Sequence, residues 1–337
     1  MKKTMFLLSA LTLLLFVYAL VTFDFNLDRT IAAAEQPQDY YQDAAGENES
    51  EMFGCIGESE DEGILDAIDP CSLVEAGHEY EEESINSAPC TAELDEYLQN
   101  YGNSVAVFYM DIQSGFTYMF NPDRVFFSAS INKAKHALYL YHLAEQGLLN
   151  MSRVHTYTEY DHWEGTGRIQ DMEFGSTFTT RELLRRSIRD SDNIAFRMLI
   201  RSYGLRGYMD FVREIGADES LIRNITGSNS TARDAGLWAY AIYQYLISDG
   251  AYAQTFKTDL LNTLTIIRAD YPIASKYGWA TNAFHDMGIV FADSPYILVI
   301  LSDMYQNNGA FAPFSRISRK VEEFHRRYFA EAADGRS

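Results

Sequence analysis

The chain has 337 residues, 47% of them hydrophobic, and a formal net charge of −21 at pH 7. This length and composition suffice for one large domain or two ordinary ones with a substantial buried core. The acidic balance excludes a nucleic-acid-binding role, because such a role requires a basic surface.

The chain begins with a segment typical of an export signal. Lys2 and Lys3 precede an uncharged run from Met5 to Phe23, and its 19 residues approach the roughly 20 that cross a bilayer as a helix. The run is either retained as a membrane anchor or removed by cleavage after Ala34, and the sequence leaves both open. In either case we expect the rest of the chain to be exported, either anchored to the outer face of the cytoplasmic membrane or secreted.

Residues 24–90 form an acidic segment. They contain 19 Asp or Glu residues and one arginine, Arg29. Such a composition buries too little apolar area to offset the entropy of ordering the chain. We therefore predict a disordered linker between membrane and domain, with a docking or regulatory role as the alternative.

All three cysteines, Cys55, Cys71 and Cys90, lie in this acidic segment. Which two would pair in an exported chain cannot be deduced from the sequence. Residues 91–337 contain no cysteine, so catalysis by a thiolate is excluded there. Neither Cys-x-x-Cys nor His-Glu-x-x-His occurs, and we expect no metal site and no cofactor.

Residues 91–337 are predicted to form one domain with strands at both ends and helices between them. The expected helices are 92–101, 130–146, 179–188, 193–203, 207–215, 231–247 and 314–329. The expected strands are 104–112, 115–121, 274–280, 285–291 and 296–302. The simplest packing is an α+β fold in which one five-stranded antiparallel sheet is flanked by the terminal helices, with an all-α lobe and a cleft beside it.

Three short motifs can line this cleft, and the first is Ser130-Ile131-Asn132-Lys133. Residues three apart share one face of a helix, so Lys133 can fold back over the Ser130 hydroxyl. A serine hydroxyl is a poor nucleophile at neutral pH and needs such a base within reach. Lys133 must be neutral to accept a proton, and we expect burial and the like charge of Lys276 to lower its pKa from about 10.4 to about 7.

The other two motifs follow in order along the chain, as Ser191-Asp192-Asn193 and Lys276-Tyr277-Gly278. Taken alone, the former is an ordinary sequence for a helix N-terminus and the latter is uninformative. Lysine is scarce, however, since two of the five lysines outside the export signal lie in these motifs. The conjunction of all three motifs therefore predicts an acyl-serine active site.

With these motifs, residues 92–328 resemble the penicillin-recognising serine hydrolases, specifically their class A β-lactamase-like branch. The other segments that carry the resemblance are Phe127-Ser128-Ala129-Ser130, Gly165-Thr166-Gly167, Leu183-Leu184-Arg185-Arg186-Ser187-Ile188, Ser230-Thr231-Ala232-Arg233-Asp234 and Asp286-Met287-Gly288-Ile289-Val290. The resemblance implies a β-lactamase/transpeptidase-like fold with the active site between sheet and helical lobe.

The resemblance also implies four catalytic residues. Ser130 would be the nucleophile and Lys133 its base. Ser191 would pass a proton to the leaving nitrogen, and Lys276 would keep the site electropositive.

The implied substrate-binding residues are Asn193, Tyr277, Gly278, Trp279 and His285. Asn193 would hold the substrate's amide carbonyl, and the backbone N–H groups of Ser130 and Trp279 would form the oxyanion hole. The family usually has Ser or Thr at the middle of the third motif, where its hydroxyl grips the substrate carboxylate, and many members add an Arg on the next strand. This chain has Tyr277 and Met287 there, so His285 is either a substitute donor or a structural histidine.

A second departure concerns the segment from Gly216 to Thr231. In class A β-lactamases this region is a longer loop whose glutamate activates water against the acyl-enzyme. Here the loop looks about ten residues too short, and Glu219 stands near its beginning rather than at the expected place. The resemblance therefore implies that the base for deacylation is missing.

We predict an extracytoplasmic serine hydrolase or acyltransferase that acts through an acyl-Ser130 intermediate on D-alanyl cell-wall peptides or related amides. One alternative is a class A-like β-lactamase. The other is a wall- or drug-binding module that acylates slowly or only binds, because Tyr277 obstructs the site. The expected partners are a small-molecule or peptidoglycan-peptide substrate, β-lactams as substrates or inhibitors, and the membrane through residues 5–23.

Overall fold

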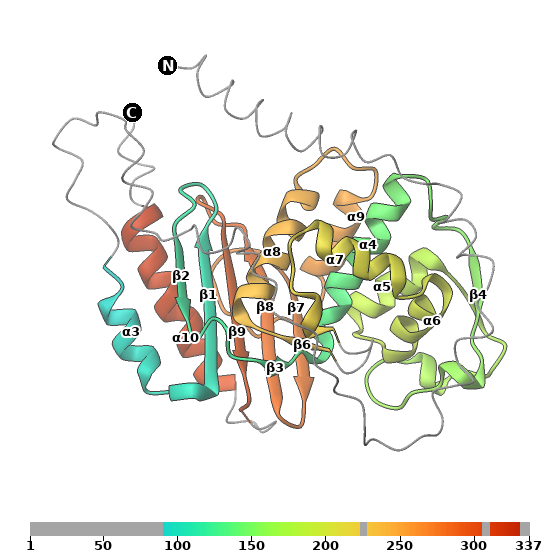
Figure 1. Ribbon diagram of the computed structural model, residues 1–337, viewed down its shortest axis with the longest axis horizontal. Coiled ribbons are helices and arrows are strands. Elements are labelled where there is room, and N and C mark those ends of the chain that lie inside the picture. The colour runs from blue at the N-terminus through green and yellow to red at the C-terminus, as the bar shows by residue number, and fades with distance from the viewer. Residues whose placement is uncertain (1–89, 223–227, 305–310, 331–337) are drawn as a thin grey trace, which may run out of the picture. The chain divides into compact units, whose positions relative to one another are not determined.

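The computed structural model describes residues 90–222, 228–304 and 311–330, all within one compact unit of the chain (Figure 1). The predictions for the export signal, for the acidic segment up to residue 89 and for two of the three cysteines concern residues outside these ranges. The third, Cys90, is exposed. No helix within the described ranges is both long enough and apolar enough to span a membrane.

One five-stranded antiparallel sheet joins the two ends of this unit, in the order β2-β1-β9-β8-β7. The strands are β1 (Val105–Asp111), β2 (Thr117–Phe120), β7 (Ile273–Ala280), β8 (Ala283–Val290) and β9 (Tyr296–Ser302). The first strand pairs with the last, with Val105 opposite Ser302. The predicted sheet and its α+β class are therefore confirmed.

The sheet has an apolar core on each face. Alternate residues of a strand point to opposite faces, and β9 supplies both cores in this way. Its residues on one core are Tyr296, Leu298 and Ile300, and those on the other are Ile297, Val299 and Leu301. Burial on both faces explains why this stretch is an unbroken apolar run.

Two helices cover one face of the sheet, α3 (Ala92–Gln99) and α10 (Phe311–His325), and a π-helical turn, η8 (Arg326–Ala330), follows α10 (Figure 1). Leu98 of α3 and Phe314 and Val321 of α10 are fully buried in the core on this side. The helices predicted at both ends of the domain therefore pack together on one layer.

The other face of the sheet meets a group of six helices (Figure 1). They are α4 (Asn132–Glu145), α5 (Thr180–Arg189), α6 (Asn193–Tyr203), α7 (Arg206–Glu214), α8 (Ala232–Leu246) and α9 (Ala253–Leu261). Every residue of α4 from Asn132 to Tyr141 is buried. Polar side chains on this helix are therefore held away from bulk water.

Three features of the fold were not predicted. Helix α9 is one, and the others are two short ribbons, β3 (Phe126–Phe127) with β6 (Asn229–Ser230) and β4 (Val154–Thr156) with β5 (Thr177–Thr179). Strands of two or three residues are too short to show an alternating pattern. The β3–β6 ribbon matters for function, because it fixes the chain just before Ser130.

Candidate active site

Ser130 lies in a 3-10 turn, η4 (Ala129–Ile131), that leads directly into α4. Ala129, the residue before it, has a positive φ of 46°, a conformation that costs energy for a residue with a side chain and persists where surrounding structure enforces it. Strand β7 provides part of that enforcement. A Cβ atom on Gly278 would lie only 3.0 Å from the Ser128 carbonyl oxygen, so glycine allows the strand to pack against the turn that carries Ser130.

Lys133 is buried one turn further along and points toward the second motif. Its Nζ donates to the Ser191 carbonyl oxygen at 2.5 Å, to Asn193 Oδ1 at 2.7 Å and to Ser191 Oγ at 3.2 Å. Among the described residues, no hydrogen bond reaches the Ser130 hydroxyl, so the predicted contact between Ser130 and Lys133 is not formed. Catalytic hydrogen bonds are often loose without substrate and tighten in the complex.

Burial lowers the pKa of Lys133 to about 7, against the opposing effect of the Asp192 carboxylate. A substantial fraction of Lys133 is therefore neutral at neutral pH and able to accept a proton. The value agrees with the one expected from the sequence, although its main cause is burial rather than the charge of Lys276.

Ser191 is fully buried and has a positive φ of 51°. Its Oγ lies between the two lysines of the site, 3.2 Å from Lys133 Nζ and 3.1 Å from Lys276 Nζ. Lys133 is on helix α4, whereas Lys276 is on β7, the edge strand of the sheet. The hydroxyl thus connects the two lysines across the junction of helices and sheet.

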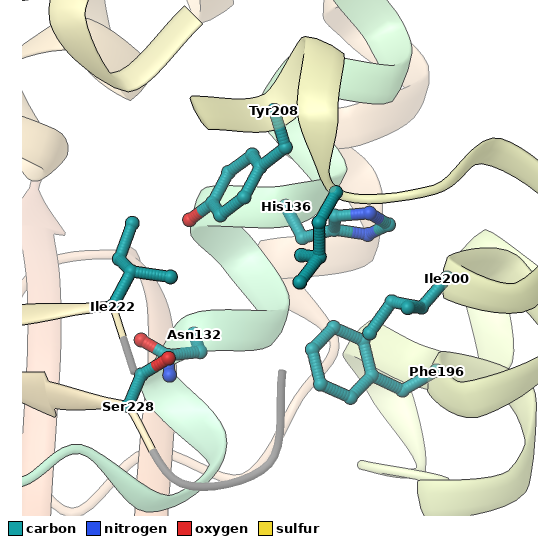
Figure 2. Close-up of a pocket in the computed structure, with 8 residues that line it drawn as sticks. Asn132, His136, Phe196, Ile200, Tyr208, Ile222 and Ser228 are labelled. Atoms are coloured by element: carbon teal, nitrogen blue, oxygen red, sulfur yellow. The ribbon is translucent and has the colours of Figure 1, made fainter. Parts of the chain in front are cut away.

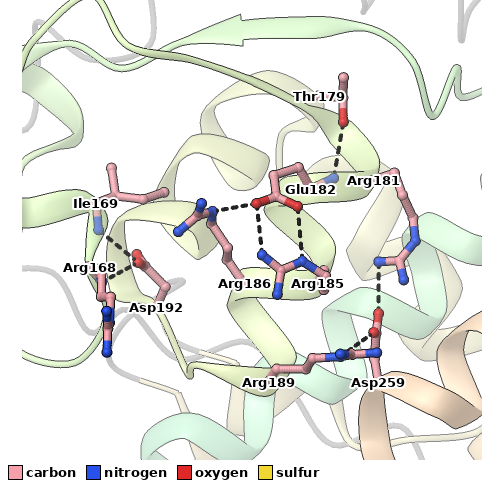
Figure 3. A network of polar contacts seen from close by, with 10 residues as sticks. All are labelled: Arg168, Ile169, Thr179, Arg181, Glu182, Arg185, Arg186, Arg189, Asp192 and Asp259. Carbon is pink, nitrogen blue, oxygen red and sulfur yellow. Dashed lines mark hydrogen bonds and ion pairs between the residues drawn. The ribbon is translucent and has the colours of Figure 1, made fainter. Parts of the chain in front are cut away.

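The carboxylate of Asp192 holds the second motif in place (Figure 3). One oxygen accepts from the backbone N–H groups of Ile194 and Ala195, which begin α6, at 3.0 and 2.9 Å. The other accepts from the backbone N–H groups of Arg168 and Ile169 at 2.8 and 3.0 Å. Asp192 is therefore a positioning residue that ties the helix start to the loop that precedes it in the chain.

That loop, Gly165-Thr166-Gly167, packs directly on the second motif. A Cβ atom on Gly165 would lie 2.6 Å from Asn193 Nδ2, and one on Gly167 would lie 2.2 Å from Asp192 Cγ. Asn193 Oδ1 accepts from Lys133, and its Nδ2 donates to the Glu164 carbonyl oxygen at 3.4 Å. The amide of Asn193 is thus oriented from both sides, as a group that binds substrate must be.

Lys276 is fully buried on β7. Its Nζ donates to Ser191 Oγ and, at 3.0 Å, to the Tyr277 carbonyl oxygen, and it also lies 3.9 Å from the centre of the Tyr277 ring. Burial first, and the charge of Lys133 second, hold the pKa of Lys276 well below its usual value, against the opposing charge of Asp286. Burial therefore works against the predicted role of Lys276 as a permanent positive charge.

Tyr277 and Trp279 occupy neighbouring positions on the same strand. Tyr277 is only 9% exposed. Trp279 packs edge-to-face against Phe284 and Phe311, and its indole N–H is buried without a hydrogen-bond partner among the described residues. Both side chains therefore belong largely to the packing of the sheet's edge, while the Trp279 backbone follows Gly278 beside the nucleophile turn.

Of the two roles that the sequence left open for His285, that of a substitute donor to substrate is wrong in this structure. The ring is fully buried; its Nε2 is 2.8 Å from the Phe127 carbonyl oxygen, and its Nδ1 accepts from the Ser302 backbone N–H at 3.0 Å. Burial lowers its pKa to about 4, so the ring is neutral with its proton on Nε2. His285 therefore connects strands β3, β8 and β9 behind the nucleophile and has no donor left for a ligand.

The loop from Gly216 to Thr231 supplies no carboxylate to the site. Its only acidic residues are Asp218 and Glu219. Asp218 accepts from the backbone N–H of Ser220, and the half-exposed Glu219 carboxylate accepts from Arg213 Nε at 2.8 Å. This surface ion pair agrees with the prediction that the loop lacks a base for deacylation.

A small pocket with a volume of about 10 Å³ lies beside α4, facing α6 and α7 (Figure 2). His136, one turn beyond Lys133, lies against it; burial lowers its pKa to about 3 and its Nε2 has no partner among the described residues. The other lining residues are Asn132, Phe196, Ile200, Leu205, Tyr208, Ile222 and Ser228. In the part of the chain that the structure describes, no group of His, Cys, Asp or Glu side chains could hold a metal ion.

The fold of the chain matches that of known proteins. A β-lactamase from Sphaerobacter thermophilus superposes with a TM-score of 0.62 at 20% identity, covering 68% of this chain and 94% of its own. PBP-A gives 0.64 at 19% identity, covering 70% and 97%, and an ancestral class A β-lactamase gives 0.59 at 21%, covering 69% and 98%. At such identities these likenesses show the shared β-lactamase-like fold.

A sequence search of curated proteins found no match. The model of the β-lactamase enzyme family, by contrast, matches residues 89–324, which include all three motifs. The chain is therefore a serine hydrolase that belongs to the β-lactamase enzyme family.

Proposed function

We propose that the protein forms an acyl-enzyme on Ser130 and acts outside the cytoplasm on D-alanyl cell-wall peptides or related amides and esters. The observation that supports the reaction most is the position of the Ser191 hydroxyl between two buried lysines, of which Lys133 follows Ser130 by one helical turn. This arrangement can move a proton from a nucleophile to a leaving group without exposing either lysine to solvent.

The proposed first half-reaction uses these groups in order. Neutral Lys133 takes the proton of the Ser130 hydroxyl as Oγ bonds to the substrate's carbonyl carbon. The Ser191 hydroxyl then gives its proton to the leaving nitrogen and recovers one from Lys133, to which it is hydrogen-bonded. The carbon–nitrogen bond breaks, the amine departs, and the acyl group stays on Ser130.

The second half-reaction distinguishes a peptidase from a β-lactamase. The acyl group must be transferred to water or an amine, which general-base assistance accelerates typically by about 10²–10⁴-fold. Glu219 is engaged with Arg213 at the surface, and its loop has no other free carboxylate. We infer that an acyl-enzyme from which no leaving group departs, such as that from penicillin, is slow to hydrolyse here.

A structural relative supports acylation by penicillin. A variant of PBP-A, similar to this chain with a TM-score of 0.63, is described as an acyl-enzyme complex with penicillin G. Since Ser130, Lys133 and Ser191 come together here, we propose that this chain is acylated in the same manner.

Intact-mass spectrometry of the full chain during incubation with benzylpenicillin tests the proposal. We expect an adduct of one penicillin that persists for minutes or longer, and its absence in Ser130→Ala. Rapid loss of the adduct with turnover of the drug would favour the β-lactamase alternative. No adduct at any time from benzylpenicillin or from its methyl ester would favour a module that only binds, and would contradict acyl-enzyme formation.

The export signal supports an extracytoplasmic location, which we propose on sequence grounds alone. Fractionation of cells that produce the full chain, combined with N-terminal sequencing, tests it. Recovery in the membrane with Met5–Phe23 intact indicates an anchor, and recovery in the medium with a new N-terminus near Ala34 indicates cleavage. Recovery in the cytoplasm would contradict the proposal.

A further inference from the structure

Tyr277 lies directly against Lys276, one of the two buried lysines of the site. The two residues are consecutive on β7. Because β7 is the edge strand of the sheet, no further strand lies along its open side to keep their side chains apart. Lys276 Nζ lies 3.9 Å from the centre of the tyrosine ring. The ring thus covers one side of the Lys276 amino group, in the geometry of a cation–π contact when that group is protonated.

The remaining directions around Lys276 Nζ are also occupied. Its Nζ donates to Ser191 Oγ at 3.1 Å and to the Tyr277 carbonyl oxygen at 3.0 Å. The third side faces the ring, and Lys276 has no exposed surface. A carboxylate could reach this lysine only by displacing the tyrosine.

The other lysine of the site is equally committed. Lys133 Nζ donates to both oxygens of Ser191 and to Asn193 Oδ1, and it is 3% exposed. On the neighbouring strand the residue opposite Lys276 is Met287, which is apolar and buried. Neither Lys133 nor Lys276 is therefore free to bind an incoming anion.

Besides Lys276, which already has hydrogen-bond partners, the charged groups that act on Tyr277 are unfavourable to an anion. The carboxylates of Asp190 and Asp286 both act on its phenol and raise its pKa, adding to the larger effect of burial, while an interaction with Ser191 lowers it. A substrate carboxylate at this position would therefore lose its hydration and meet two negative charges without gaining a cation.

We propose that Tyr277 excludes carboxylates, so that the enzyme acylates Ser130 from donors whose leaving group is uncharged next to the scissile bond, such as an amidated or esterified peptide. This substrate class rests on the proposed function, because it requires that Ser130 be acylated. It assigns Tyr277 as a specificity-determining residue rather than as a group that binds the carboxylate.

Benzylpenicillin and its methyl ester test the proposal, because they differ only in the carboxylate. The rate of adduct formation on the full chain is followed by intact-mass spectrometry. For the wild type we expect the ester to react at least about tenfold faster than the acid, the scale of one hydrogen bond to a charged group. In Tyr277→Thr, which opens access to Lys276, we expect the acid to gain at least about tenfold relative to the ester.

Comparison of the same two compounds across variants cancels any difference in their intrinsic reactivity. Tyr277→Phe retains the ring and should retain the preference for the ester. A Tyr277→Phe variant that prefers the acid would overturn the role of the ring. The wild-type and Tyr277→Phe results stand even if Tyr277→Thr does not fold.

The two levels of the proposal fail differently. A wild type that reacts with the acid as fast as with the ester, or faster, overturns the exclusion of carboxylates and leaves acylation of Ser130 intact. Absence of an adduct from either compound in every variant overturns the proposed function, and the substrate class falls with it.

Discussion

Lys135 and Asp234 form an ion pair within the core, with Nζ 2.7 Å from Oδ2 and side chains only 3% and 6% exposed. Lys135 also donates to Ser230 Oγ at 3.0 Å. Because Lys135 is on the helix that carries Lys133, and Ser230 is on the strand that pairs with Phe126, this cluster connects the catalytic helix to α8 and to the segment before Ser130.

Substitution of one partner of this pair should destabilise the protein strongly. Lys135→Met leaves the Asp234 charge buried without its partner, which typically costs about 3–5 kcal/mol. We expect the loss in chemical denaturation, and a double variant, Lys135→Met with Asp234→Leu, should lose less than the sum of the single changes. The matched control is Arg233→Met, whose pair with Asp123 is exposed and should contribute less than about 1 kcal/mol.

Additive losses in the double variant would show that the two residues do not act as a pair. A smaller loss of unfolding free energy in Lys135→Met than in the Arg233→Met control would show that this cluster does not hold α4 to α8 and to the segment before Ser130.

The main helices and the strands of the sheet were predictable because the hydrophobic pattern of each extends over more than one turn of helix or one pleat of strand. Helix α6 begins at Asn193 and ends at Tyr203 as expected, since Asp192 caps its start and Gly204 follows its end. Strand β9 has the expected bounds because its burial on both faces requires an apolar run. Short elements such as β3 and β6 carry no such pattern and form through contacts that are distant in sequence.

The site was predictable as a set of residues but not in its contacts. The three motifs meet, yet Lys133 bonds Ser191 and Asn193 instead of Ser130. The role of His285 stayed open in the sequence, because a lone histidine on a strand gives no sign of whether its nitrogens face the cleft or the backbone. A partial sign was available in the apolar residues around it, which indicated a buried strand.

Ser130→Ala should abolish covalent labelling by penicillin or its methyl ester while leaving the fold intact. Ser130 is partly exposed and its hydroxyl bonds to no described residue, so its loss removes no structural contact. Intact-mass spectrometry and thermal unfolding check the two halves of this prediction. Ser220→Ala, a change at an exposed serine, is the control and should label normally; a Ser130→Ala protein that still labels would show that the nucleophile is another residue.

Lys133→Ala and Ser130→Ala should each reduce acyl transfer by a similar, large factor, and the double variant should be scarcely worse than either. A nucleophile and its base act as a unit, so their effects do not add. Lys133→Arg should not rescue activity, because a guanidinium group stays protonated and cannot accept a proton. Single-turnover rates check this, and independent, additive losses would refute a shared proton transfer.

The rate of acylation should rise with pH through about 7. Below its pKa of about 7, Lys133 is mostly protonated and cannot act as the base; the neutral fraction grows about tenfold per pH unit until the curve levels above that value. Adduct formation by the penicillin ester, measured over a pH range that spans this value, checks the prediction. The residual reaction of Lys133→Ala should lack this limb, and a limb that survives in the variant would assign the titration to another group.

Glu219→Gln should leave the lifetime of the penicilloyl adduct unchanged. The Glu219 carboxylate is held by Arg213 at the surface, 51% exposed, and is not available to activate water at Ser130. Because Arg213 is also exposed, Arg213→Gln is a matched control that breaks the same ion pair, and both variants should alter stability by less than about 1 kcal/mol.

Adduct decay is followed by mass spectrometry after removal of free drug. If the adduct lasts about tenfold or more longer in Glu219→Gln than in the wild type, and its lifetime in Arg213→Gln is not prolonged, the Glu219 carboxylate takes part in deacylation after all. Equal lifetimes in all three proteins would show that the Glu219 carboxylate gives no help to hydrolysis of the acyl-enzyme, as expected for an enzyme that releases peptides but stalls on penicillin.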